Sequence, residues 1–122
     1  MTKSVGEKRV YDLEERTALF GEAAIDFATS LPRNAVSSPL ISQFIRSATS
    51  VGANYCEADD AESKRDFRHK IAICRKEARE TKHWLRMLAR ALPESKDRAR
   101  DLWQETKELH LILSKILRNT KI

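Results

Sequence analysis

The sequence is poor in the residues that make turns and in long apolar runs. It has three glycines and three prolines among 122 residues, which argues against a turn-rich β-sandwich. The lack of a long apolar run argues against a transmembrane helix, and the first eleven residues lack the apolar segment of a secretory signal. We therefore expect a single-domain cytoplasmic protein that has no membrane partner.

Cysteine is also scarce, and the two present lie within helical patterns. Cys56 and Cys74 are predicted to be reduced, buried thiols of a cytosolic protein. Glu80 and His83 have the Glu-x-x-His spacing of di-iron helical bundles, but that site needs two copies and two further glutamates. Only one copy is present, and the seam positions flanking His83 direct it outward. We predict no metal and no cofactor.

What the chain does have is charge and helical periodicity. Charged residues make up 34% of it, which is typical of long helices. Four amphipathic segments are predicted to be helices, over residues 12–30, 38–60, 63–91 and 96–118. Their 3.5-residue seams and short connections predict an all-α fold, an antiparallel up-down-up-down four-helix bundle with a left-handed twist. The bundle domain spans residues 12–119, after a flexible N-terminal arm of residues 1–11.

The predicted core follows from these seams. For helix 63–91 it is Phe67, Ile71, Cys74, Ala78, Thr81, Leu85, Leu88 and Leu92. For helix 12–30 it is Leu13, Thr17, Phe20, Ala24, Phe27 and Leu31, and for helix 96–118 it is Ala99, Leu102, Thr106, Leu109, Leu113 and Ile116. The apolar side of helix 38–60 is Ile41, Phe44, Ile45, Ala48, Val51, Gly52 and Tyr55.

Local signals place the helix starts and one close contact. Ser38 followed by Pro39 predicts an N-cap and first helical residue, and Ser63 with Asp66 resembles a capping box. Gly52 weakens its helix by about 1 kcal/mol relative to alanine, so we expect tight packing there.

Helix 63–91 carries most of the excess positive charge. Residues 62–92 have a net charge of +6, while the whole chain has +5. One interpretation is a solvated face, partly neutralised by Glu77 and Glu80. The other is a phosphate-binding surface for nucleic acid, whose affinity depends on salt. Its candidate residues are Arg65, Arg68, Lys76, Arg79, Lys82, Arg86 and Arg90.

A polar stripe follows one face of helix 38–60. It consists of Gln43, Arg46, Ser50, Asn54 and Glu57. Such a stripe is either solvated or an interface between copies of the chain, with Arg46 and Glu57 pairing across it to groups such as Glu77 and Glu80 or Arg75 and Arg79. Trp84 and Trp103 are either packing residues or platforms on which nucleic-acid bases stack.

Two sequence blocks resemble a known family. The first runs Gln43-x-x-Arg46-Ser47-Ala48-x-Ser50-Val51-x-x-Asn54-x-x-Glu57-Ala58. The second has Asp66-Phe67, Ile71-Ala72 and Lys76-Glu77-Ala78-x-Glu80-Thr81-x-x-Trp84-Leu85. Together they resemble the bacterial four-helix-bundle proteins named for 23S rRNA intervening sequences, over about residues 11–115. His83 departs from the aromatic residue often found there.

The resemblance implies a homopentamer with no established catalytic activity. It places the family's motif positions at Arg46, Ser50, Asn54, Glu57, Glu77 and Glu80. Our hypothesis is a non-enzymatic homo-oligomer that binds structured RNA or DNA through helix 63–91. The alternatives are a protein–protein adaptor ring that docks an unidentified protein and, less favoured, a metal-dependent enzyme of the ferritin-like kind.

Overall fold

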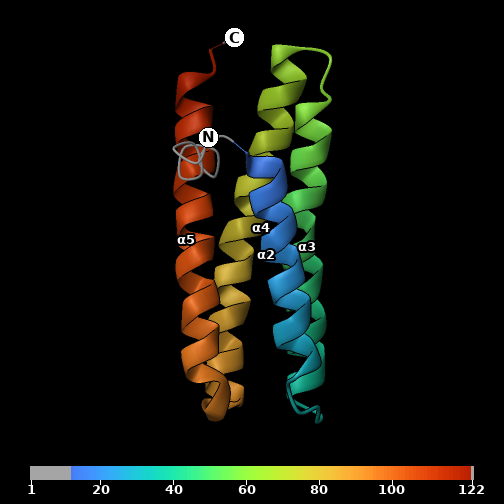
Figure 1. Cartoon of the computed structure of the whole chain (residues 1–122), viewed down its shortest axis with the longest axis vertical. Helices are drawn as coiled ribbons and strands as arrows, with labels where there is room; N and C mark the ends of the chain where they lie inside the picture. Colours follow the sequence, from blue (N-terminus) through green and yellow to red (C-terminus); the bar gives the residue numbers. More distant parts are fainter. Residues whose placement is uncertain (1–11, 122) are drawn as a thin grey trace, which may run out of the picture.

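The structure, a computed structural model, describes residues 12–121. Over this range the chain forms the helices α2 (Leu13–Thr29), α3 (Ser37–Asp59), α4 (Lys64–Ala91) and α5 (Lys96–Asn119), with a short 3₁₀ helix, η1 (Pro93–Ser95), before α5. The helices run alternately down and up the long axis (Figure 1). The predicted all-α four-helix bundle is confirmed. The predicted arm of residues 1–11 lies outside the described residues.

Sequence neighbours are also the main packing neighbours. Helix α2 packs on α3, α3 on α4 and α4 on α5, while α2 and α5 contact each other over much less of their length. In Figure 1, α5 lies beside α4. Helix α5 therefore borders two lateral surfaces of the bundle, one that it shares with α4 and one that it shares with α2.

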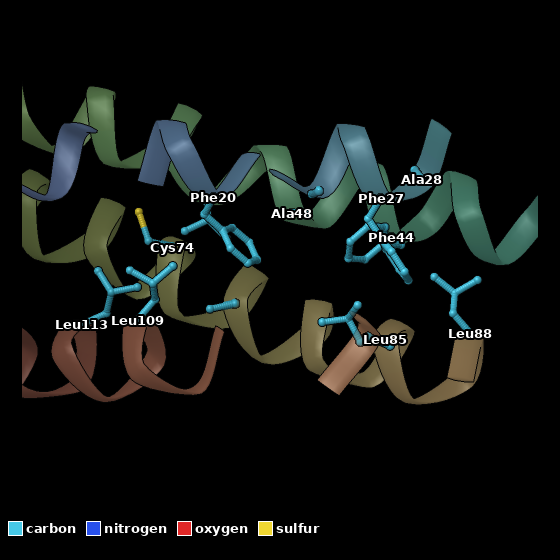
Figure 2. Close-up of a cluster of buried hydrophobic side chains, with 14 of the residues drawn as sticks. Phe20, Phe27, Ala28, Phe44, Ala48, Cys74, Leu85, Leu88, Leu109 and Leu113 are labelled. Atoms are coloured by element: carbon cyan, nitrogen blue, oxygen red, sulfur yellow. The ribbon is translucent and has the colours of Figure 1, made fainter. Parts of the chain in front are cut away.

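The predicted seams form the core. All six seam residues of α2 are buried, as are those of α4 from Ile71 onward. Phe27 and Phe44 meet edge to face with ring centroids 5.8 Å apart, and Figure 2 shows Leu85 and Leu88 of α4 close to this pair. Burying such side chains contributes about 1.5–3 kcal/mol each, and this burial holds the four helices together.

One part of the core prediction is wrong. In α5, Ile116 is only half-buried and Leu117 takes its place in the core. A straight helix has 3.6 residues per turn, so a strict 3.5-residue seam drifts by about 20° per heptad. By the end of α5 the inward position has moved by one residue. Leu102 is half-buried as well, although the seam residues on either side of it, Ala99 and Thr106, are buried.

The helix starts follow one prediction and depart from the other. The Ser63 hydroxyl accepts a hydrogen bond from the backbone N–H of Asp66 at 3.0 Å, as predicted. The predicted Ser38 cap is wrong, because α3 begins at Ser37. The Asn34 side chain instead accepts bonds from the N–H groups of Val36 and Ser37, each at 2.8 Å, and so caps the helix from outside.

The two cysteines differ in exposure. Cys74 is buried, as predicted, but Cys56 is exposed, so the prediction of two buried thiols is wrong. On α3 the inward positions near this end are Val51 and Ala58. Cys56 lies two residues before Ala58, about 200° away around the helix, which directs it outward.

Candidate functional site

Helix α4 carries its acidic and basic side chains on two different flanks. Glu77 and Glu80 lie on the flank that faces α3, where Arg46 contacts both carboxylates. Residues spaced by three, four or seven share one side of a helix. By this rule the opposite flank of α4 carries Arg68, Arg75, Arg79, Lys82 and Arg86.

Contacts with α5 confirm the direction of this basic flank. The guanidinium of Arg68 donates from Nε to the carbonyl oxygen of Thr120, just beyond α5, at 3.3 Å. Burial and then the positive charges of Lys82, Arg75 and Arg79 lower the pKa of His110 on α5. The positive potential of α4 is therefore directed towards α5, where it adds to burial in favouring the neutral form of His110.

Helix α5 divides its charges in the complementary way. Asp101, Glu105 and Glu108 line the surface towards α2, where Arg16 of α2 bonds to both glutamates at 2.8 to 2.9 Å. The flank towards α4 follows spacings of four, three, four and three residues. It carries Lys96, Arg100, Trp103, Lys107 and His110.

The two basic flanks meet at a groove of about 330 Å³ between α4 and α5. Leu85 and Ala89 of α4 and Ala99 of α5 form its apolar part. Among residues 12–121, none of the side chains that line it is acidic; the polar and aromatic ones are Arg86, Lys96, Arg100, Trp103 and Gln104. One of these cations, Arg100, lies 3.5 Å from the exposed Asp97, which is not among the lining residues. The groove therefore offers an apolar floor with a cationic rim.

Trp103 lies at the centre of this positive charge. The ammonium of Lys82 is 5.5 Å from its ring centroid and that of Lys107 is 5.8 Å away. Trp84 has different surroundings, because its indole N–H donates to Glu80 at 3.0 Å on the α3 side of α4. The two tryptophans, equivalent as candidates in the sequence, are thus distinguished by their neighbours.

The predicted nucleic-acid residues do not form one patch. Six of the seven are exposed and Lys82 is half-buried. Arg68, Arg79, Lys82 and Arg86 lie on the flank towards α5. Lys76 instead lies near Glu80, and Arg65 and Arg90 lie near the two ends of α4. The predicted set did not include Arg75 of α4 or the three cations of α5, which are Lys96, Arg100 and Lys107. The regular helical spacing of the α5 cations around Trp103 was the signal that could have identified them.

The polar stripe of α3 forms hydrogen bonds within the chain. Arg46 pairs with Glu80 and, at 3.3 Å, with Glu77, so the carboxylates named as partners across an interface are its partners within one chain. Glu57 pairs with Lys70 at 2.7 Å. Bonds inside α3 complete the network: Arg46 to Gln43 at 3.3 Å, Ser50 to the Arg46 carbonyl at 2.7 Å and Asn54 to the Ser50 carbonyl at 2.9 Å.

This network links α3 to α4 and lowers the pKa of Glu80. The hydrogen bond from Trp84 is the largest cause that lowers the pKa of Glu80, and the bond and charge of Arg46 lower it further. Glu80 therefore stays ionised over a wider pH range than a free glutamate. The stripe binds the two helices in one protomer, and its charges have partners before any second copy is considered.

The surface between α2 and α5 has the opposite charge. A groove of about 710 Å³ lies there, with Leu19, Phe20 and Leu102 among its lining residues. Its acidic members are Asp12, Glu15, Asp101, Glu105 and Glu108, and among residues 12–121 its one cationic member is Arg16. Leu19 is 53% exposed. The two sides of α5 thus border grooves of opposite charge.

The Glu80 and His83 pair, which the sequence analysis did not favour as a metal site, gains no further ligands within the described part of the chain. His83 is exposed while its neighbours Thr81 and Leu85 are buried. Residues 12–121 contain no group of three or more His, Cys, Asp or Glu side chains close enough to share an ion. Within the same range, no helix is both long and apolar enough to cross a membrane.

Comparisons with known proteins agree with the architecture, an all-α four-helix bundle. The profile of the 23S rRNA-intervening sequence protein family matches residues 11–115. The chain therefore belongs to this family. No curated protein sequence gives a significant match.

A solved structure supports both the fold and the family. It is the crystal structure of a protein with unknown function from the S23 ribosomal protein family of Bacteroides thetaiotaomicron. The two chains are 27% identical, with a TM-score of 0.82, over 91% of this chain and 99% of the other. The resemblance seen in the sequence is thereby confirmed.

Proposed function

We propose that this protein is a non-catalytic module that binds structured nucleic acid, RNA or DNA, through the basic surface shared by α4 and α5. The observation that supports this most is the separation of charge. Acidic side chains of α4 face α3 and those of α5 face α2, while cations from both helices border the groove between them. Such a surface holds a strong positive potential, because few carboxylates neutralise it.

The ligand is expected to be recognised chiefly through its phosphates. Lysine and arginine side chains that neutralise phosphates release counterions, so affinity falls steeply as salt is added. With about four phosphate contacts, a rise from about 50 to about 200 mM salt lowers the affinity roughly 100-fold. Sequence-independent binding of this kind requires no recognised RNA-binding motif.

The test is fluorescence anisotropy with a labelled RNA hairpin and a labelled DNA duplex over a salt series. We expect the double variant Arg79→Gln/Arg86→Gln to lose roughly 10-fold in affinity and to reduce the salt slope by about 2. The matched control, Arg33→Gln/Lys115→Gln, removes the same charge from exposed positions away from the groove. Equal losses in both variants, or no binding by the wild type at low salt, would refute the proposal.

We further propose that the active form is a cytoplasmic homo-oligomer, in the form of a pentameric ring. Leu19 and Ile25 support contact through α2, because they are 53% and 47% exposed on a helix rich in acidic residues. Light scattering should give five times the 14.0 kDa mass of one chain. Leu19→Glu should lower that mass, whereas Val36→Glu, at an exposed position before α3, should not. A monomeric wild type would exclude the ring.

A second candidate function is a protein adaptor, favoured by the groove between α2 and α5. Its exposed Leu19 and acidic rim match a partner that carries a basic apolar segment. If the wild type binds neither nucleic acid at low salt, this function becomes the better one. Elemental analysis of the purified protein tests the remaining alternative, since stoichiometric iron, manganese or zinc would indicate a metalloenzyme.

A further inference from the structure

Trp103 differs from the other aromatic side chains in where its ring lies. It is half-buried, lines the groove between α4 and α5, and has two ammonium groups within 6 Å of its ring centroid. Part of the ring packs against the core, and the rest borders the apolar floor made by Leu85 and Ala99. A flat aromatic surface thus lies inside a cationic rim.

Trp84 is an internal comparison for this environment. It too is half-buried and lies near the same end of the bundle. Its indole N–H donates to the Glu80 carboxylate at 3.0 Å, and its ring meets His83 edge to face at 4.9 Å. An acidic neighbour disfavours a phosphate, so Trp84 has the aromatic ring without the anion-binding surroundings.

We propose that Trp103 is a stacking platform for one unpaired base of a bound nucleic acid, with Lys82, Lys107, Arg86 and Arg100 contacting the flanking phosphates. The inference rests on the proposed function and names the chemistry of that surface. Single-strand binding sites combine a cationic groove with aromatic rings on which bases stack. The groove between α4 and α5 supplies both parts.

The size of the groove and the strengths of the contacts agree with a single base. A volume of about 330 Å³ is at the lower end of small-molecule sites, which span about 300–1,000 Å³. Base stacking on an aromatic ring is stronger than an exposed cation–π contact. A base therefore displaces the lysine ammonium groups from the ring, and their flexible stems allow them to reach the neighbouring phosphates.

The experiment distinguishes the contribution of base stacking to affinity from the contribution of phosphate binding. It compares a labelled single strand of about 12 thymidines with an abasic strand that has the same number of phosphates. We expect the wild type to bind the base-bearing strand about 5- to 150-fold more tightly, the range measured for one stacked base. Trp103→Leu should bring that ratio close to one, while Trp103→Phe should retain most of it.

Trp84→Leu is the matched control, because it removes an equally half-buried indole outside the groove and should leave the ratio unchanged. A second measurement does not depend on the stability of Trp103→Leu. In the variant Trp84→Phe, all tryptophan emission comes from Trp103, since the chain has two tryptophans. The base-bearing strand should quench this emission, and the abasic strand should not.

The outcomes distinguish this inference from the proposed function. If the wild type binds both strands equally, stacking is refuted and the phosphate-binding proposal stands. If Trp103→Leu weakens binding of both strands by the same factor, Trp103 has only a structural role. If neither strand and no structured nucleic acid binds at low salt, the proposed function fails together with this inference.

Discussion

The packing of α2 against α3 allows a paired prediction about two glycines. A Cβ at Gly52 would lie 3.3 Å from the carbonyl oxygen of Thr17 and 3.4 Å from its hydroxyl oxygen. A Cβ at Gly21 would lie 4.0 Å from its nearest neighbours, both atoms of Thr49. Neither glycine has a positive φ, so the two sites differ in the space available and not in backbone conformation.

The expected stabilities follow from this difference. Replacing a glycine inside a helix with alanine contributes about 0.5–1 kcal/mol through reduced entropy of the unfolded chain and better helix propensity. Gly21→Ala should be more stable than the wild type by this amount, because the added methyl group makes an ordinary van der Waals contact. At Gly52 the methyl presses on backbone, and overpacking costs about 1–3 kcal/mol. Gly52→Ala should therefore be neutral or destabilising by up to about 2 kcal/mol.

Urea unfolding followed by far-ultraviolet circular dichroism measures both variants under one condition. For a domain of this size, 1 kcal/mol corresponds to roughly 3–5 °C in Tm, so thermal unfolding provides a second readout. We expect Gly21→Ala to unfold at a higher urea concentration and a higher Tm than the wild type. Gly52→Ala should unfold at the same or lower values. If Gly52→Ala were as stabilising as Gly21→Ala, the close approach of α2 to α3 would not constrain the protein.

Two further predictions concern the cysteines and the contact between α2 and α5. Ellman's reagent should modify Cys56 in the native protein and Cys74 only on unfolding. Burial raises the pKa of Cys74 to about 12, while an unfolded thiol titrates near ~8.5. The contribution of Cys74 to stability should thus be complete below that pH and be lost at about 1.4 kcal/mol per pH unit between it and the pKa of the folded protein. Arg16→Met should cost about 1–2 kcal/mol, because Arg16 is 13% exposed and bonds in bidentate fashion to Glu105. Arg100→Met, at a 59% exposed site, should cost under about 0.5 kcal/mol.

Clear results would contradict each of these predictions. Rapid modification of both thiols in the native protein would mean that Cys74 is accessible. A Cys74→Ala variant that retained the same loss of stability above about pH 9 would assign the effect to other groups. Equal losses from Arg16→Met and Arg100→Met would show that the ion pair between α2 and α5 contributes no more than an ordinary surface pair.

The periodicity of the sequence determined the fold to a large extent. Side chains three and four residues apart share a helix face, so apolar residues at those spacings had to be buried together, as Phe27, Ala78 and Leu109 are. The cap at Ser63 was also readable, because a capping hydrogen bond spans three residues. Both signals are local, and local geometry is what a sequence records directly.

Other features were not predicted correctly, although their causes are local or lie in the geometry of one helix. The displaced start of α3 follows from a local cap, in which the Asn34 side chain accepts hydrogen bonds from the backbone N–H groups of Val36 and Ser37. The exchange of Ile116 for Leu117 follows from the drift of the inward position along α5. Both were missed because Ser38 followed by Pro39 resembles a usual helix start and because a strict 3.5-residue seam ignores the drift of a 3.6-residue helix.

The candidate site was likewise determined partly by the sequence and partly by the packing of the helices. The sequence by itself determined that α4 is basic and that cations of α5 recur beside Trp103 at helical spacing. Only the tertiary structure decided that these two flanks face each other, since α5 packs on α4 over most of its length and on α2 over little. The tertiary structure also decided that Glu77 and Glu80 form ion pairs with Arg46 of the same chain. A helix records which residues share a flank, but the packing of helices decides which flanks form a surface together.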